Sequence, residues 1–459
     1  MQNYLKTLVL SALVLLTLDA CVRFHSHPLS AKKNAAALES RSLTDEGLQS
    51  FIDKNDLNAK NDWPKKVWDL NFLTLAAFYY HPDMEIARGE LKAAVAAIKT
   101  AKAVPNPTFS FAPQYITNPG SLSPWILGFN FDLPIETARK RHHRIVQAKH
   151  LSEAARYHAL STAWQVRSRV RAALIDFDMA LQKEKIFSEE EKSFSENLRS
   201  MEEFQKQGMV SPLVFNEAVL NESKTHLAYE ESKKQTGLAK IELATSLGLP
   251  VSVLEQTKIS FDDFKTTLKK MNSAKIREEA LTNRPDILAA LSDYAACEAN
   301  LQEEISKQYP DIHLGPGFAW SQGDHQWGLG FSLSLPIFNQ NRGPIAEAKA
   351  RCEQKSAQFT ALQAKIIGEI DSALINYNSA FKKFQIANQL LKSLNTKYEL
   401  LHSMLADSEA VRLTMANNEL ELDSLRTTDV DNLLEVQKAV GLLEDAIQKP
   451  LVHIFRGAL

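Results

Sequence analysis

Few residues in this sequence of 459 residues stand at spacings that suggest chemistry. Its three cysteines, Cys21, Cys297 and Cys352, form no CxxC pair, which argues against a zinc ribbon or a thioredoxin-like site. We expect Cys297 and Cys352 to be unpaired, because two cysteines on helices meet only when packing brings them together. His142 and His143 are adjacent on a predicted helix and point about 100° apart. A solvated basic face therefore explains them better than a metal site.

Sequence motifs of catalysis and of nucleotide binding are absent. The sequence holds no HExxH, no Walker loop, no dinucleotide fingerprint and no nucleophile elbow. Its glycine clusters, Gly315–Gly317 and Gly328–Gly330, fall in predicted strands rather than in phosphate-binding loops. Lys and Arg number 53 against 55 Asp and Glu, so there is no basic field for nucleic acid. We predict a protein that is not an enzyme, that needs no cofactor or metal, and that does not bind nucleic acid.

The N-terminus predicts export from the cytoplasm. Lys6 precedes an apolar run over residues 8–18, shorter than the roughly 20 residues that span a bilayer. The run leads into Cys21 in a sequence similar to a bacterial lipobox, where this cysteine would carry lipid, although Asp19 is unusual there. Ordinary signal cleavage just before Cys21 is the alternative. Both interpretations make residues 1–20 a signal peptide.

The elements that would position any site come from a duplication. His-Pro-Asp at 81–83 matches Arg-Pro-Asp at 284–286, and Trp125–Ile135 matches Trp327–Ile337 at a nearly constant offset. A series of matches in one order indicates two copies of one unit. The predicted organisation is a signal peptide (1–20), an extended N-terminal segment (21–67), a first repeat (68–250) and a second repeat (251–459).

Each repeat is predicted to be a helix, a β-hairpin and a long helical hairpin. The predicted helices are Asp83–Ala103, Thr137–Lys206, Pro212–Leu247, Asp286–Lys307, Ile345 to near Asn417, and Asn432–Ala446. The second of these gives a rod roughly 100 Å long. Gly208, Ser211 and Pro212 suit the C′, N-cap and N1 positions of a tight tip. We place the second tip at Leu425–Asp431, which has no glycine.

Two-residue alternation predicts β-hairpins over 108–133 and 312–335. Large apolar residues such as Phe129 and Phe331 occupy one face, and the other face is small or polar, without Lys, Arg or Glu. This pattern favours a membrane barrel wall around a wet lumen over a soluble sheet. Four aromatic residues flank the loops and suggest a membrane-interface girdle, with cross-strand pairing as the alternative: Tyr115, Trp125, Trp320 and Trp327.

Four strands cannot close a barrel, because the smallest single barrels need about eight. Open sheet edges are also not viable in lipid. We therefore predict an obligate oligomer in which several chains share one wall. This argument alone does not decide between two, three and four subunits.

The paired helix starts, the two Leu-Pro-Ile motifs at 133–135 and 335–337, the tip at 208–211 and the duplication together resemble the TolC-type outer membrane efflux protein family. The basic run after the first hairpin, 133–141, is similar to the heavy-metal efflux CzcC-like branch. The resemblance implies a mainly α fold, with a long antiparallel coiled-coil α-barrel, four β-strands per chain and a homotrimer. It also implies the outer membrane as location, with a periplasmic helical extension, and an inner-membrane pump and a periplasmic adaptor as partners.

The resemblance also assigns roles to particular residues. The tip residues Gly208, Val210 and Ser211 would contact the adaptor. Three acids would line the pore aperture and favour cations, although exposed acids at a helix end are an equally good interpretation: Asp429, Asp431 and Glu435.

The predicted function is a passive outer membrane exit duct for small molecules or metal ions in a tripartite efflux system. A non-conducting periplasmic coiled-coil adaptor or envelope spacer is the alternative, as is the outer membrane component of type I protein secretion. The sequence leaves the cargo and the partner pump open.

Overall fold

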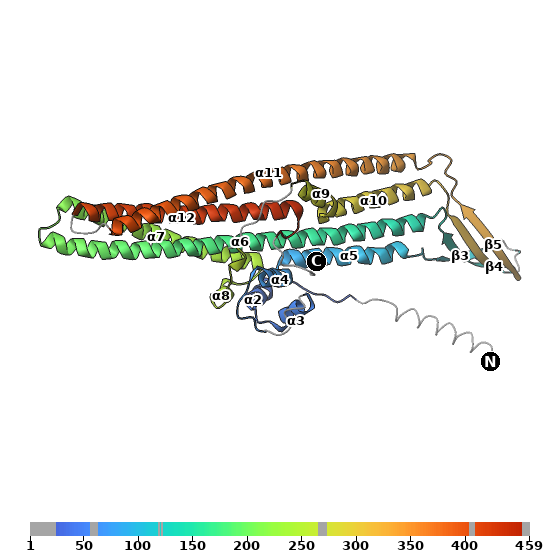
Figure 1. Ribbon diagram of the computed structural model, residues 1–459. Helices are drawn as coiled ribbons and strands as arrows, with labels where there is room; N and C mark the ends of the chain where they lie inside the picture. The colour runs from blue at the N-terminus through green and yellow to red at the C-terminus, as the bar shows by residue number, and fades with distance from the viewer. Residues whose placement is uncertain are drawn as a thin grey trace. The chain divides into compact units, whose positions relative to one another are not determined.

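The computed structural model describes residues 24–55, 63–117, 120, 123–264, 273–403 and 409–451 (Figure 1). The chain divides into two compact units, residues 1–42 and residues 43–459. The first unit contains the helix α2 (Ala31–Glu39), which the side chain of Ser30 caps by accepting a hydrogen bond from the Lys33 amide.

The second unit begins with α3 (Glu46–Asn55), so helices α2 and α3 both lie in the segment 21–67 that we predict to be extended. That part of the prediction is wrong. The reason is visible in α3, where Leu48 and Ile52 stand four residues apart on one face and are fully buried.

The second unit holds the two repeats. The first repeat contains α4 (Leu70–Tyr80), α5 (Pro82–Lys102), β1 (Thr108–Phe111), β2 (Gln114–Tyr115), β3 (Trp125–Ile135), α6 (Lys140–Lys206), α7 (Pro212–Leu247) and α8 (Val251–Glu255). The second contains the 3-10 helix η1 (Asp262–Phe264), α9 (Ser273–Asn283), α10 (Pro285–Ser306), β4 (Ile312–Ser321), β5 (Asp324–Leu333), α11 (Arg342–Ser403) and α12 (Glu409–Ile447). The predicted long helices and the duplicated order are both present.

The short helices of each repeat meet end to end, beside one long helix. Gly248 ends α7 with a φ of +69°, and a Cβ there would lie 3.0 Å from the carbonyl oxygen of Tyr80, the last residue of α4 just before α5. In the second repeat Arg284, just before α10, donates a 2.8 Å hydrogen bond to the carbonyl of Ala446 near the end of α12. The helices α5 and α7, placed end to end, therefore run alongside α6, and α10 and α12 run alongside α11 in the same way (Figure 1).

The sheet has the order β1-β3-β4-β5 and is antiparallel throughout. β2 continues β1 along β3, and Pro113 separates them because proline has no amide hydrogen for the ladder. Gln322 and Gly323 form the turn between β4 and β5, both with positive φ, as tight hairpins require. Among the described residues, the outer edges of β1 and β5 pair with no strand.

The second helical tip does not lie where we predict it. α12 begins at Glu409, so residues 425–431 are inside a helix and the predicted tip there is wrong. Residues 425–431 contain no glycine or proline that would end a helix, and burial of Val430 and Val436 against neighbouring helices favours its continuation. The turn between Ser403 and Glu409 lies outside the described residues.

Candidate functional site

The sheet carries one continuous apolar face. The register places Phe129 opposite both Phe111 and Phe318, and Phe331 opposite Leu314, so the large side chains of all strands share one side. Many of them are exposed in this chain, and Phe331 is 74% exposed. An apolar face of this extent on the outside of a protein marks a surface for a non-aqueous environment. Its members include Phe109, Phe111, Trp125, Leu127, Phe129, Phe131, Leu133, Leu314, Phe318, Trp327, Leu329, Phe331 and Leu333.

The four predicted girdle aromatics differ in position. Tyr115 and Trp125 are partners in register, with ring centroids 5.1 Å apart, so cross-strand pairing occurs here. Trp320 is opposite His325, close to the hairpin turn. Trp327 lies three residues into β5, rather than next to the loop as expected, because β5 already begins at Asp324. A role at a membrane interface stays a prediction for all four.

The opposite face of the sheet is small and polar. Gly315 and Gly317 leave room for the side chain of Asn130, since a Cβ at position 317 would lie 3.0 Å from its Oδ1. Beside it, Nδ1 of His313 lies 3.0 Å from a carboxylate oxygen of Asp132, diagonally across β3 and β4. The sequence analysis missed this pair, because only the strand register brings the two residues together.

A partly buried ion pair fixes the sheet to α6. Lys140 at the start of α6 lies 2.7 Å from Asp311 and donates a 2.6 Å hydrogen bond to the carbonyl of Tyr309. The amide of Thr137 donates to Asp311 as well, at 2.9 Å. Although burial opposes the shift, the Lys140 ammonium and the Thr137 amide hold the pKa of Asp311 below its ordinary value. The first turn of α6 is thus anchored at the point where β4 begins.

The first helical tip has the predicted geometry. Gly208 has a φ of +73° after the last turn of α6, and Ser211 accepts a hydrogen bond from the Val214 amide as the N-cap of α7. Val210 is half-buried between them. Contact of these residues with an adaptor stays a prediction.

The three candidate aperture acids lie on α12. Asp431 forms an ion pair with Lys183 of α6, and Glu435 forms one with Lys383 of α11 at 2.8 Å. Burial raises the pKa of Asp429, whose Oδ1 atom lacks a hydrogen-bond partner among the described residues. The basic partners of the other two acids come from helices distant in sequence, so the sequence could not indicate them.

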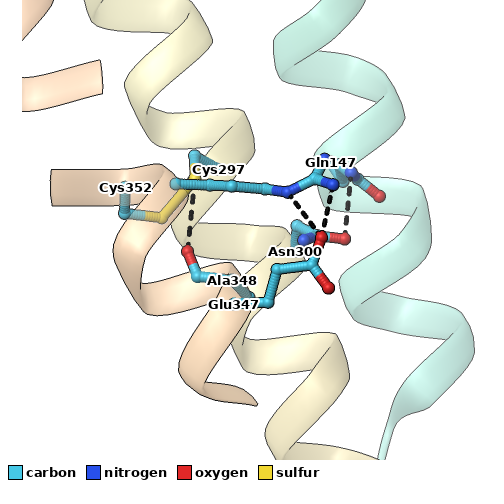
Figure 2. The surroundings of a disulfide bond; sticks show 7 residues. Gln147, Cys297, Asn300, Glu347, Ala348 and Cys352 are labelled. Atoms are coloured by element: carbon cyan, nitrogen blue, oxygen red, sulfur yellow. Dashed lines mark hydrogen bonds and ion pairs between the residues drawn. A yellow bond between two sulfur atoms is a disulfide. The ribbon is translucent and has the colours of Figure 1, made fainter. Parts of the chain in front are cut away.

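Cys297 and Cys352 form a disulfide bond between α10 and α11 (Figure 2). The expectation that they are unpaired is therefore wrong. The two helices pack side by side and bring the Cα atoms within 5.6 Å, inside the usual range for a disulfide. Next to the disulfide bond, the side chain of Gln147 on α6 donates a 3.3 Å hydrogen bond to that of Asn300 on α10. The two contacts together link α6, α10 and α11.

Cys21, the predicted lipidation site, lies outside the described residues. In the described part of the chain, no three or more His, Cys, Asp or Glu side chains are grouped to hold a metal ion, and no helix combines the length and apolarity needed to cross a membrane. His142 and His143 lie close to each other near the start of α6, with ring centroids 5.7 Å apart.

An open antiparallel sheet with one apolar face, joined to helices about 100 Å long, defines a class of membrane channel subunits that complete a barrel between chains. The profile of the outer membrane efflux protein family matches residues 77–249 and 276–441, one segment in each repeat. The chain belongs to this outer membrane family, which confirms the resemblance stated above. A family of transport channels also agrees with the prediction that the chain is not an enzyme.

Individual relatives are distant. The pyoverdine export outer membrane protein OpmQ of Pseudomonas putida is 26% identical over 192 residues, 40% of each protein. The cobalt-zinc-cadmium resistance protein CzcC of Cupriavidus metallidurans is 20% identical over 281 residues, 61% of this chain and 65% of the relative. The chain thus spans less than two thirds of the length of these relatives.

Solved structures share the fold over most of the chain. The CmeC outer membrane channel of Campylobacter jejuni superposes with a TM-score of 0.68 at 17% identity and covers 93% of both chains. A structure of CusC gives a TM-score of 0.67 at 18% identity, over 84% of this chain and 94% of that one. The predicted fold class, long helices with a four-strand antiparallel sheet, is confirmed.

Proposed function

We propose that the protein is one subunit of a passive outer membrane exit duct that serves a tripartite efflux system. The single observation that carries this proposal is the sheet, which has a large apolar outer face, a small polar inner face and two edges that pair with no other described strand. A wall of this kind suits lipid on one side and water on the other, and only further copies can close it.

Three subunits of four strands each would make a twelve-stranded barrel, as the family resemblance implies. The long helices would then continue the barrel into the periplasm as a tunnel. A duct needs no energy source of its own, so an inner-membrane pump would drive export, connected by a periplasmic adaptor at the tip around Gly208, Val210 and Ser211. Cys21 would anchor the mature N-terminus by its lipid.

The relatives named for pyoverdine export and for cobalt, zinc and cadmium resistance suggest small molecules or metal ions as cargo. Three carboxylates on α12, those of Asp429, Asp431 and Glu435, would favour cations at the far end of the tunnel. The ion pairs of Asp431 with Lys183 and of Glu435 with Lys383 would weaken this preference for cations.

The test is reconstitution of the full-length protein, purified in mild detergent. We expect a trimer by mass measurement and stepwise conductance in planar bilayers. A stable monomer that stays soluble without detergent would overturn the proposal and favour an adaptor or spacer.

The aperture assignment has its own test in the same assay. We expect the Asp431→Asn and Glu435→Gln variants to lose part of the preference for K⁺ over Cl⁻. Asp371→Asn is the matched control, because Asp371 is also an exposed acid on a long helix, ion-paired with Arg277 of α9. If all three variants change selectivity equally, the acids of α12 do not form the aperture.

A further inference from the structure

The polar face of the sheet carries very little charge. Most positions in the described strands are glycine, alanine, serine or another uncharged residue. The titratable exceptions on this face are Asp132, His313 and Asp324. Asp324 stands at the hairpin turn, eight residues along β5 from Ser332, the partner of His313, which corresponds to roughly 27 Å. Any electrostatic effect at the other end of this face therefore comes from Asp132 and His313.

The two side chains are paired and reach solvent. Nδ1 of His313 lies 3.0 and 3.1 Å from the two carboxylate oxygens of Asp132, and the side chains are 37% and 44% exposed. The partners of His313 in register are Pro134 on β3 and Ser332 on β5, neither of which is charged. Two further acids at this end of the sheet are already ion-paired with α6, Asp311 with Lys140 and Glu136 with Arg144.

We propose that the His313–Asp132 pair adds a pH-dependent contribution to the ion selectivity of the duct at the sheet. This inference rests on the proposed function, because it requires the polar face to line the water-filled lumen. With a neutral imidazole, each chain adds one uncompensated carboxylate to the lumen, and with a protonated imidazole the pair is neutral. Histidine is the side chain that ordinarily changes charge between pH 5 and 8, whereas carboxylates stay ionised over that range.

The effect is large enough to measure. A unit charge roughly 8 Å from a permeating ion changes its local concentration by about twofold in water, and every subunit contributes a copy. Screening acts over about 10 Å at 0.1 M salt, so the measurement belongs at low ionic strength. Asp324 is beyond that screening length and does not obscure the result.

The experiment measures the K⁺/Cl⁻ permeability ratio of the wild-type protein in planar bilayers under a KCl gradient, at pH 8 and pH 5.5. We expect the ratio to fall about twofold or more in acid. The His313→Gln variant should keep the pH 8 ratio at both values. His325→Gln is the matched control: this histidine lies on the same sheet but on the apolar face, stacked against Phe318, and its loss should leave the wild-type response intact.

A second variant gives an independent result if His313→Gln does not assemble. Asp132→Asn removes the carboxylate but keeps the imidazole. Its K⁺/Cl⁻ permeability ratio at pH 8 should therefore be lower than that of the wild type, and at pH 5.5 the ratio should fall further, towards anion preference. A conducting wild-type channel with a constant permeability ratio would overturn the assignment of this pair. A wild-type acid response in His313→Gln, or a wild-type ratio at pH 8 in Asp132→Asn, would overturn it as well. A wild-type protein that conducts nothing would refute the duct itself, which is a different failure.

Discussion

Removing the disulfide between α10 and α11, with the double variant Cys297→Ala/Cys352→Ala, should destabilise the second repeat. The bond closes a loop with a sequence separation of 55 residues, which contains the whole β4–β5 hairpin. In the chain-entropy description, a cross-link stabilises the folded state by limiting the conformations of the unfolded chain, and longer loops give larger effects. A loop of this length gives roughly 4 kcal/mol.

The assay is guanidinium unfolding in mild detergent, followed by tryptophan fluorescence, because Trp320 and Trp327 lie inside the closed loop. The variant should unfold at a lower denaturant concentration than the oxidised wild type. Wild-type protein treated with a reducing agent is the matched control, and its midpoint should approach that of the variant.

Two results would refute this reasoning. If iodoacetamide labels Cys297 and Cys352 in unfolded protein that was never reduced, the bond does not form and the thiols are free, as the sequence alone suggested. If the bond is present but the oxidised and reduced proteins unfold at the same midpoint, the loop is already restricted by other contacts and the entropic argument fails.

Three further predictions concern single residues. Gly208→Ala should destabilise the tip by about 1 kcal/mol because its φ is positive, whereas Gly237→Ala, inside α7 with open space around it, should be neutral or stabilising in the same denaturation assay. Arg284→Met should cost about 1–3 kcal/mol because it leaves the Ala446 carbonyl and two partly exposed carboxylates, those of Asp286 and Glu369, without their donor. Arg277→Met, at an exposed pair, should cost less than about 1 kcal/mol. The folded pKa of Asp311 is lowered, so its ion pair should stabilise the protein above pH about 4, and that contribution should be lost as pH falls further. The stability difference between wild type and Asp311→Asn should therefore shrink between pH 5 and 3, and a constant difference would contradict the assignment.

The sheet and the long helices could be predicted because their signals are local. The alternation from Trp125 to Leu133 repeats every two residues, and the register confirms that these side chains share one face. The first tip was also predictable, since Gly208 and Ser211 provide the special backbone angle and the cap that such a turn requires.

Features that depend on packing were not predictable in the same way. Nothing in the spacing of Cys297 and Cys352 shows that α10 and α11 lie side by side, and the pairing of His313 with Asp132 depends on the register between the two repeats. The prediction places the second tip by its position in the repeat, although residues 425–431 contain no glycine or proline to end a helix, and they lie inside α12. Helices α2 and α3 lie in a segment predicted to be extended, although α3 carries a usable signal, the four-residue spacing of its buried side chains.

The unpaired outer edges of β1 and β5 have a consequence for how the protein matures. A solitary chain in a bilayer would expose two rows of backbone amides and carbonyls to hydrocarbon, at a cost of several kcal/mol for each unsatisfied group. Insertion of a solitary chain is therefore unfavourable, and we expect the polypeptides to associate before or during insertion. Maturation should then follow a steep concentration dependence, so that cells making too little of this protein would build disproportionately few finished pores.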